Sequence, residues 1–327
     1  MKLLITGISG CIGAATAQYL LSQGVDEVVG LSRRGDLTRI ACQHQSQVKM
    51  ITGDITNLDQ VRNVFEQVQP THVIHLAAFQ TPECQANPLQ GMRVNVGGWL
   101  NVLDAARELE GHLQRMVFAS SAAVYGPRSI YPSQEVHEEM PYLPRSLYGY
   151  WKVAGEGAGQ AFFQETGITT VSLRLATTYG PGRDQGLTSA PTKLLKAAAL
   201  GVPFEMPYQG REHYHFVDDV GAAFAQAAIE DFAGYGVFNL RGQTREVAEF
   251  ITLVKEIANQ EGRSQTDNLK VSPAAEPIAF ICDLAQEEIL TAFPQVPLTP
   301  LRRGIERSLR FFQQQVHTGE LTVNEID

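Results

Sequence analysis

A tyrosine and a lysine stand four residues apart in the segment YGYWK, residues 148–152. On a helix, this spacing places the side chains of Tyr148 and Lys152 on one face. A phenol with a pKa near ~10 is a weak base at neutral pH, but a neighbouring ammonium and an oxidised nicotinamide both favour the phenolate. Tyr148 would then exchange a proton with an alcohol or ketone while hydride moves to or from the cofactor. The pair is the predicted catalytic centre, although the same spacing also occurs on ordinary surface helices.

The segment FASSAAVYG, residues 118–126, supplies a candidate third member. It lies at the carboxyl end of a predicted strand, which is where parallel sheets bind their ligands. There, the Ser121 hydroxyl can hydrogen-bond the reacting oxygen and stabilise developing charge; the alternative is a serine turn that only ends the strand. Tyr125 is a competing phenol, but it has no lysine four residues further on.

The segment TGISGCIG, residues 6–13, lies between a predicted strand and an amphipathic helix. Glycines let the backbone turn sharply and approach a pyrophosphate, which rests on the helix N-terminus. The GxxGxxG spacing is weak evidence alone, since glycines also mark plain turns, and its position between strand and helix is what predicts a dinucleotide site. The contacts expected here are Gly7, Gly10, Cys11, Ile12 and Gly13.

The second predicted strand is followed by Ser32, Arg33 and Arg34. An NAD site usually has a carboxylate at this point to bind the ribose diol. A hydroxyl and guanidinium groups instead suit a 2′-phosphate, unless the arginines are simply solvated. The sequence therefore favours NADP as cofactor, with NAD kept as the alternative.

Further cofactor contacts are expected where the third and fourth strands end. The Asp54 carboxylate could accept a hydrogen bond from the adenine amine, or it could cap a helix, with Thr56 and Asn57 as rivals for that role. Small residues after His75 leave room for the cofactor, and His75 itself is predicted to be a packed strand residue. The contacts expected here are Asp54, Ile55, Leu76, Ala77 and Ala78.

These motifs require a particular set of elements to position them. Apolar runs predict strands at residues 2–6, 27–31, 48–52, 72–77, 114–119 and 169–175, and helical periodicity predicts helices at 12–21, 58–67 and 94–109. Strands that alternate with helices in this way indicate an α/β fold: a Rossmann-type doubly wound parallel sheet.

The second half of the chain departs from this alternation. A loop-rich stretch runs from Gly180 to about Gly210, and residues 217–229 and 237–240 indicate a return to the sheet. We expect a dinucleotide-binding domain at 1–175, with 217–241 returning to it. Residues 176–216 and 242–327 would then form a smaller C-terminal substrate-binding lobe.

Composition narrows the class of partner. The 327 residues carry a net charge of −9, with no basic run longer than two arginines, which argues against nucleic acid and anionic membranes. Four scattered cysteines without CxxC spacing, no apparent leader and no long apolar run predict a cytoplasmic, soluble protein with a small-molecule substrate. His213 and His215 precede Asp218 and Asp219, but no third clustered ligand is evident, so no metal is expected.

The ordered motifs resemble the extended short-chain dehydrogenase/reductase family, which includes nucleotide-sugar epimerases, dehydratases and reductases. The resemblance covers roughly residues 1–240: the glycine segment, Asp54, HLAA at 75–78, NVGG at 95–98, SSAAVYG at 120–126, Tyr148 with Lys152, Arg174, YGP at 179–181 and VDD at 217–219. It implies Tyr148 as general acid/base, Lys152 as electrostatic partner and ribose anchor, and Ser121 as donor to the substrate oxygen. It also implies that Asn95 supports the active site beside the cofactor, and that the helices bearing Asn95 and Tyr148 form a homodimer.

Several positions depart from the family pattern. The acidic residues of dehydratases are replaced by Ala122 and Ala123, which argues against dehydration. Thr177 stands where nucleotide-sugar epimerases commonly have Asn, and Glu212 where they tend to have Arg, so Arg211 could substitute only through a register shift. Arg183 is either an anion anchor or a solvated loop charge. The substrate contacts expected are Ser121, Thr177, Arg183 and Arg211.

Three functions remain open at this point. The first is an NAD(P)-dependent epimerase that transfers hydride at a hydroxyl-bearing carbon of a sugar or nucleotide sugar. The second is a net NADP-dependent dehydrogenase or reductase of a small sugar, sugar acid or carbonyl compound. The third is a non-catalytic cofactor-sensing scaffold, against which the intact tyrosine and lysine argue. The fold alone does not decide among them.

Overall fold

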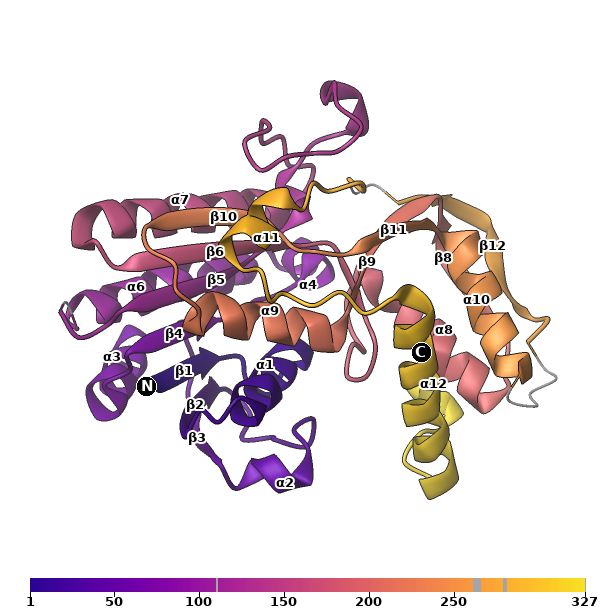
Figure 1. Ribbon diagram of the computed structural model, residues 1–327, viewed down its shortest axis with the longest axis horizontal. Coiled ribbons are helices and arrows are strands. Elements are labelled where there is room, and N and C mark those ends of the chain that lie inside the picture. The colour runs from indigo at the N-terminus through magenta and orange to yellow at the C-terminus, as the bar shows by residue number, and fades with distance from the viewer. Residues whose placement is uncertain (110, 261–265, 279–280, 327) are drawn as a thin grey trace.

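A seven-stranded parallel sheet forms the centre of the larger part of the molecule (Figure 1). The computed structural model describes residues 1–327 except 110, 261–265, 279–280 and 327. The strand order is β10-β6-β5-β4-β1-β2-β3, and every pairing in this sheet is parallel. The strands are β1 (Lys2–Thr6), β2 (Glu27–Ser32), β3 (Val48–Thr52), β4 (His72–His75), β5 (Arg115–Ser121), β6 (Thr169–Leu175) and β10 (Tyr235–Asn239). This arrangement confirms the predicted Rossmann-type fold.

Helices cover both faces of this sheet, because alternate residues of each strand point to opposite sides. On β1, Leu3 and Ile5 pack under α1 (Cys11–Ser22) and α9 (Val217–Ile229), whereas Leu4 packs toward the other face. That other face is covered by α3 (Leu58–Val68), α6 (Gly98–Arg107) and α7 (Leu147–Thr166). Two apolar layers therefore pack against the two faces of the sheet. The edge at which the strands have their carboxyl ends remains accessible to ligands.

The remaining part of the chain, on the right of Figure 1, packs around a separate apolar cluster. It contains a three-stranded sheet in the order β11-β9-β7 and a two-stranded sheet of β12 and β8. Its strands are β7 (Thr177–Tyr179), β8 (Phe204–Gln209), β9 (Arg211–Phe216), β11 (Gln243–Glu246) and β12 (Leu269–Pro277). Its helices are α8 (Ala190–Leu200), α10 (Val247–Gln260) and α12 (Leu301–Thr318). Short helices complete the fold: α2 (Cys42–Gln45), α4 (Thr81–Ala86), α5 (Pro88–Met92) and α11 (Glu287–Ala292).

The predicted single helix over residues 94–109 is wrong in its start and its continuity. The structure has α5, then a π-helical turn (Arg93–Gly97), then α6. The side chain of Ile55 lies so close to Gly98 that a Cβ there would come within 2.5 Å of the Ile55 Cδ1 atom. The wide turn lets Asn95 face the sheet edge while Gly98 stays in contact with Ile55.

Two predicted strand ends also move. The fourth strand ends at His75 rather than residue 77, because the chain leaves the sheet after Leu76 donates its amide to the Thr6 carbonyl oxygen. The fifth strand runs on to Ser121 and pairs with β6 up to Leu175. In the part of the chain that is described, no helix has the length and apolar character needed to cross a membrane.

Candidate active site

Helix α7 begins directly against the turn that follows β5. Its first residues are capped by Ser146, whose hydroxyl accepts a hydrogen bond from the Gly149 amide at 3.1 Å. Gly149 touches the backbone of Ala123, since an added Cβ would lie 2.2 Å from the Ala123 carbonyl oxygen. Only glycine permits this approach. As a result, Tyr148 lies beside the turn that starts at Ser121.

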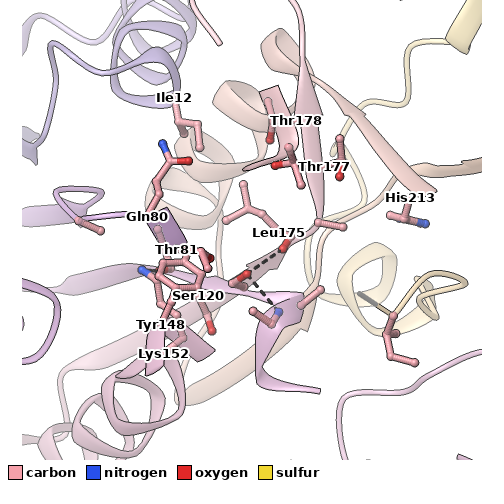
Figure 2. A pocket seen from close by; sticks show the side chains of 18 of the residues that line it. Ile12, Gln80, Thr81, Ser120, Tyr148, Lys152, Leu175, Thr177, Thr178 and His213 are labelled. Atoms are coloured by element: carbon pink, nitrogen blue, oxygen red, sulfur yellow. Dashed lines mark hydrogen bonds between the residues drawn. The ribbon is translucent and has the colours of Figure 1, made fainter. Parts of the chain in front are cut away.

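The structure brings Ser121, Tyr148 and Lys152 together in one cavity (Figure 2). The Lys152 ammonium is buried, donates to the Ala119 carbonyl oxygen at 2.6 Å, and lies 5.5 Å from the centre of the Tyr148 ring. The Ser121 hydroxyl accepts from the Ala123 amide at 3.1 Å, makes a long contact of 3.4 Å to the Leu175 carbonyl oxygen and lies in hydrogen-bond reach of the Tyr148 phenol. Its proton can therefore turn toward a substrate oxygen.

The electrostatics of the pair are dominated by burial. Burial raises the pKa of the Tyr148 phenol to about 12, opposed by a hydrogen bond with Ser121 and by the Arg183 guanidinium. Burial also lowers the pKa of the Lys152 ammonium to about 8. Without a cofactor, Tyr148 is thus protonated at neutral pH. A positively charged nicotinamide would favour the phenolate, so the proton acceptor forms when oxidised cofactor is bound.

A third residue continues the spacing of four along α7, and the sequence analysis missed it. Glu156 follows Lys152 by four positions and forms a buried ion pair with Arg174 of β6, at 2.9 Å. Arg174 binds both carboxylate oxygens, and Ser120 of β5 donates to the same carboxylate. The pair therefore fastens the catalytic face of α7 to two strands. The spacing of Tyr148, Lys152 and Glu156 was the signal available in the sequence.

The glycine segment has the shape of a dinucleotide cradle. Gly7 has φ 76°, and a Cβ there would lie 2.8 Å from the Ala77 amide nitrogen; at Gly13 it would lie 2.4 Å from the Gly7 carbonyl oxygen. Gly10 caps α1 without a side-chain hydrogen bond, so the first amides of that helix, from Cys11, Ile12 and Gly13, stay available to a phosphate. These residues fit the pyrophosphate of a nicotinamide dinucleotide.

The end of β2 lies beside this cradle. The Ser9 hydroxyl donates to the Ser32 hydroxyl at 2.6 Å, which joins the glycine segment to the strand end. Arg33 and Arg34 are exposed, and the Arg33 guanidinium lies 5.4 Å above the Phe79 ring. Attraction between a cation and an aromatic ring restricts the positions that the arginine side chain can take, compared with a free surface arginine.

The other predicted cofactor contacts lie along the same edge. Asp54 accepts from the amide and hydroxyl of Thr56, both at 2.9 Å, whereas the cap of α3 is Asn57, which accepts from the Gln60 amide. Asn57, one of the two rivals named for the helix cap, therefore takes that role. Of the small residues after β4, Ala77 touches Gly7, and Leu76 and Ala78 line the cavity.

Asn95 and His75 have supporting positions. The Asn95 side chain accepts from the Phe79 amide at 2.7 Å and donates to the Phe79 carbonyl oxygen at 2.9 Å, which fixes the loop after β4. His75 is stacked on Trp99 and Phe118, and burial lowers its pKa to about 3. His75 is thus a packed, neutral strand residue, as predicted.

The opposite side of the cavity is formed by the smaller part of the molecule. Thr177 and Glu212 line it, and the Thr177 hydroxyl donates to the Glu212 carboxyl at 2.6 Å. Arg183 also lines it and is held by Gln80 and Thr188 at 2.9 and 3.0 Å, so it is an ordered cation rather than a solvated loop charge.

Arg211, predicted as a substrate contact, is placed elsewhere. It is half exposed and pairs with Asp283 at 2.6 Å, and the lining of the cavity among the described residues contains Glu212 instead. The register shift that would exchange the two does not occur: Glu212 shares a face of β9 with Tyr214, which is packed in the apolar cluster, and the Thr177 and Tyr208 hydroxyls hydrogen-bond the Glu212 carboxyl there.

The two histidines of β9 are structural neighbours. Their ring centres lie 4.9 Å apart. The His215 Nε2 atom accepts from the Ala176 amide and Nδ1 donates to the Arg241 carbonyl oxygen, so neither nitrogen is available to a metal. Among the described residues, potential ligand atoms come together at His137, Glu138 and Glu139, which do not line the cavity, and we propose no metal there.

The fold and this site define a class: a nicotinamide-dinucleotide enzyme of the short-chain dehydrogenase/reductase type. The chain belongs to the NAD dependent epimerase/dehydratase family, whose sequence profile matches residues 3–240. It is an enzyme of the NAD(P)-dependent short-chain dehydrogenase/reductase type. The predicted family resemblance is thereby confirmed.

Individual relatives show the range of this family. The chain is 28% identical to UDP-glucuronate 4-epimerase 4 of Arabidopsis thaliana, over 95% of this chain and 75% of that protein. It is also 28% identical to D-erythronate dehydrogenase of Cupriavidus necator, over 79% of this chain and 82% of the relative. Among solved structures, a Thermus thermophilus UDP-glucose 4-epimerase complex with NAD superposes with a TM-score of 0.80 at 26% identity, covering 96% and 99% of the two chains.

Replacing Tyr148 tests the catalytic assignment. We expect Tyr148→Phe to lower kcat by about 10²- to 10⁴-fold, since a positioned general acid/base contributes rates of that order. Turnover is followed on a panel of sugars and nucleotide sugars by chromatography of the products as well as by cofactor absorbance, because an epimerisation causes no net change in the cofactor. Tyr150→Phe, an exposed phenol on the same helix, is the matched control and should leave kcat nearly unchanged. Equal losses in both variants would refute the assignment.

Replacing Glu212 tests the electrostatics of the opposite wall. Burial raises the pKa of its carboxyl to about 7 from the usual 4.5, so the folded protein binds this proton more tightly than the unfolded chain. Stability is then lost as the pH rises through that interval, and Glu212→Gln removes the loss. The free energy of unfolding, measured with urea, is compared between Glu212→Gln and the wild type at two pH values. The difference should be ~3 kcal/mol more in favour of the variant at about pH 8 than at about pH 5. A constant difference in the free energy of unfolding between variant and wild type would contradict this.

Proposed function

We propose that Tyr148, Ser121 and Lys152 oxidise a hydroxyl-bearing carbon of a sugar. The observation that carries this proposal is the meeting of the Tyr148 and Ser121 hydroxyls in a cavity backed by the Lys152 ammonium, beside the glycine cradle. Tyr148 takes the proton of the substrate hydroxyl, and Ser121 donates a hydrogen bond to the same oxygen. A bound oxidised nicotinamide would supply the hydride acceptor for the carbon, and the glycine cradle would hold its dinucleotide. Lys152 holds the ribose and stabilises the phenolate.

The first candidate reaction is an epimerisation. The ketone formed by Tyr148 and Ser121 would turn over within the cavity, and Tyr148 would return the proton as hydride reaches the opposite face of the carbon. The similarity to the Arabidopsis UDP-glucuronate 4-epimerase and the Thermus UDP-glucose 4-epimerase supports this candidate. Because no net oxidation occurs, the cofactor would stay bound from one turnover to the next.

The second candidate is a net dehydrogenase or reductase that uses NADP. Ser32, Arg33 and Arg34 provide hydroxyl and guanidinium donors at the position where a 2′-phosphate would lie, and Arg33 is supported by the Phe79 ring. The resemblance to D-erythronate dehydrogenase supports a small sugar acid as substrate. In this case the cofactor would exchange at each turnover.

Mass spectrometry of the cofactor released from denatured, freshly purified protein separates the two candidates. One NAD per chain would mean a retained cofactor and an epimerase. An empty protein that binds NADP more tightly than NAD in titration would mean a dehydrogenase. In that second case, Arg33→Ala should weaken NADP binding by about tenfold or more and leave NAD binding nearly unchanged. Arg302→Ala, at a surface ion pair with Glu256, is the control.

We also propose that the protein is a homodimer that assembles through α6 and α7. These helices pack against each other and expose large apolar side chains, including Leu100 and Tyr150, at 47% and 53% of their surfaces. Exposed apolar area of this kind is typical of an interface. Each subunit would then contain a dinucleotide-binding domain, residues 1–175 with 217–241, and a substrate-binding lobe, residues 176–216 with 242–327. The four free cysteines are consistent with a cytoplasmic location.

Light scattering during gel filtration tests the dimer. The wild type should elute at twice the 35.9 kDa of one chain, and Leu100→Glu should shift it toward the single chain because a buried unpaired charge disfavours the interface. Phe311→Glu, at an exposed apolar residue of α12, is the matched control and should remain a dimer. A wild type that elutes as one chain would rule the proposal out.

A further inference from the structure

A buried acidic group occupies the wall of the cavity opposite Tyr148. Glu212 is 1% exposed and lies on β9, beside Thr177 of β7. Figure 2 shows Thr177 and His213 across the cavity from Tyr148 and Lys152. The substrate must lie between these walls, so whatever portion of it points away from the reacting carbon meets Glu212 and Thr177.

Hydroxyl groups, not cations, surround the Glu212 carboxyl. Thr177 donates to one oxygen at 2.6 Å and the Tyr208 hydroxyl to the other at 3.2 Å. The Tyr214 hydroxyl also lies against it. The ion pairs found among the described residues do not include Glu212; its neighbour in sequence, Arg211, is paired with Asp283. A carboxyl in this setting has no positive charge to offset a second anion.

Arg183 is an ordered cation of the same cavity, hydrogen-bonded on the Gln80 side. Its charge lowers the pKa of Tyr148 and acts in the same direction on Tyr208, and its guanidinium is committed to Gln80, Thr188 and the Gln185 carbonyl oxygen. Its buried Nε atom has no hydrogen-bond partner. The charges in the cavity are therefore unevenly distributed. The Arg183 guanidinium lies toward Tyr148 and Gln80, and the Glu212 carboxyl lies at β7 and β9.

We propose that Glu212 is a specificity-determining residue: it accepts a hydrogen bond from an uncharged hydroxyl of the substrate and excludes a phosphate from the β7/β9 end of the cavity. A hydroxyl fits because it can donate a hydrogen bond to the carboxyl, whose oxygens accept from Thr177 and Tyr208. A phosphate at the same place would bring two anions together in a region shielded from water, where their repulsion is strong. This inference deepens the proposed oxidation of a sugar and rests on it, since the same cavity holds the substrate.

Binding of UDP, as a nucleoside diphosphate probe, tests the proposal by calorimetry at about pH 8, with the protein saturated in its preferred cofactor so that the dinucleotide site is closed to the probe. The wild type should bind UDP at least about tenfold more weakly than Glu212→Arg, with Glu212→Gln between them. Glu205→Gln, at an exposed carboxylate on β8 that pairs with Lys270, is the matched control and should bind like the wild type. Circular dichroism and a melting curve establish that each variant is folded.

A second measurement needs no variant. In the turnover assay, the wild type should prefer a free sugar over the phosphate ester of the same sugar, in kcat/KM, by about tenfold or more. Tight UDP binding by the wild type, equal to that of Glu212→Arg, would overturn the proposal, as would a preference for the phosphate ester or for an amino sugar. Binding does not require turnover, so an inactive enzyme that still rejects UDP would contradict the proposed reaction and leave the role of Glu212 supported.

Discussion

The buried ion pair between Glu156 and Arg174 is the interaction on which the arrangement of the active site depends. Both side chains are almost completely removed from water, at 2% and 0% exposure, and such charges are stable only with full hydrogen bonding. The partners supply this, since Tyr142 donates to Glu156 and Arg174 donates to the Tyr125 hydroxyl. Removing either charge would leave the other buried and uncompensated.

This pair determines where the catalytic face of α7 lies. Tyr148, Lys152 and Glu156 follow one another at one helical turn each, so fixing Glu156 to β6 also fixes the rotation of the helix about its axis. Gly149 and Gly155 allow the close approach this requires: a Cβ would meet the Ala123 backbone at the first and the Phe118 ring at the second. The catalytic residues therefore have rigid support from a sheet, a helix and an ion pair between them.

Contiguous motifs made much of this molecule predictable from its sequence. The glycine segment, the strand–helix alternation and the Tyr148/Lys152 spacing each depend on residues that are close in the sequence. Such features can be recognised before the fold is known. The Glu156–Arg174 pair was not predictable as a contact, because it joins two elements whose alignment is set by sheet order. Glu212 rather than Arg211 faces the cavity because Tyr214, on the same face of β9, packs in an apolar cluster whose members are far apart in the sequence. The π-helical turn at residues 93–97 is followed by Gly98, which packs against Ile55, 43 positions earlier, and a local sequence pattern does not contain such a contact.

The position of β10 at the edge of the large sheet has a consequence for how the chain is made. It pairs with β6, yet β7, α8, β8 and β9 of the smaller part of the molecule and then α9 are synthesised between the two strands. Helix α9, which covers α1 and one face of the sheet, also emerges late. A ribosome that has released only the first half of the chain therefore presents an open strand edge and an uncovered apolar face, both of which favour aggregation. The nascent protein needs protection, by a chaperone or by rapid elongation, until residue 239 has left the exit tunnel.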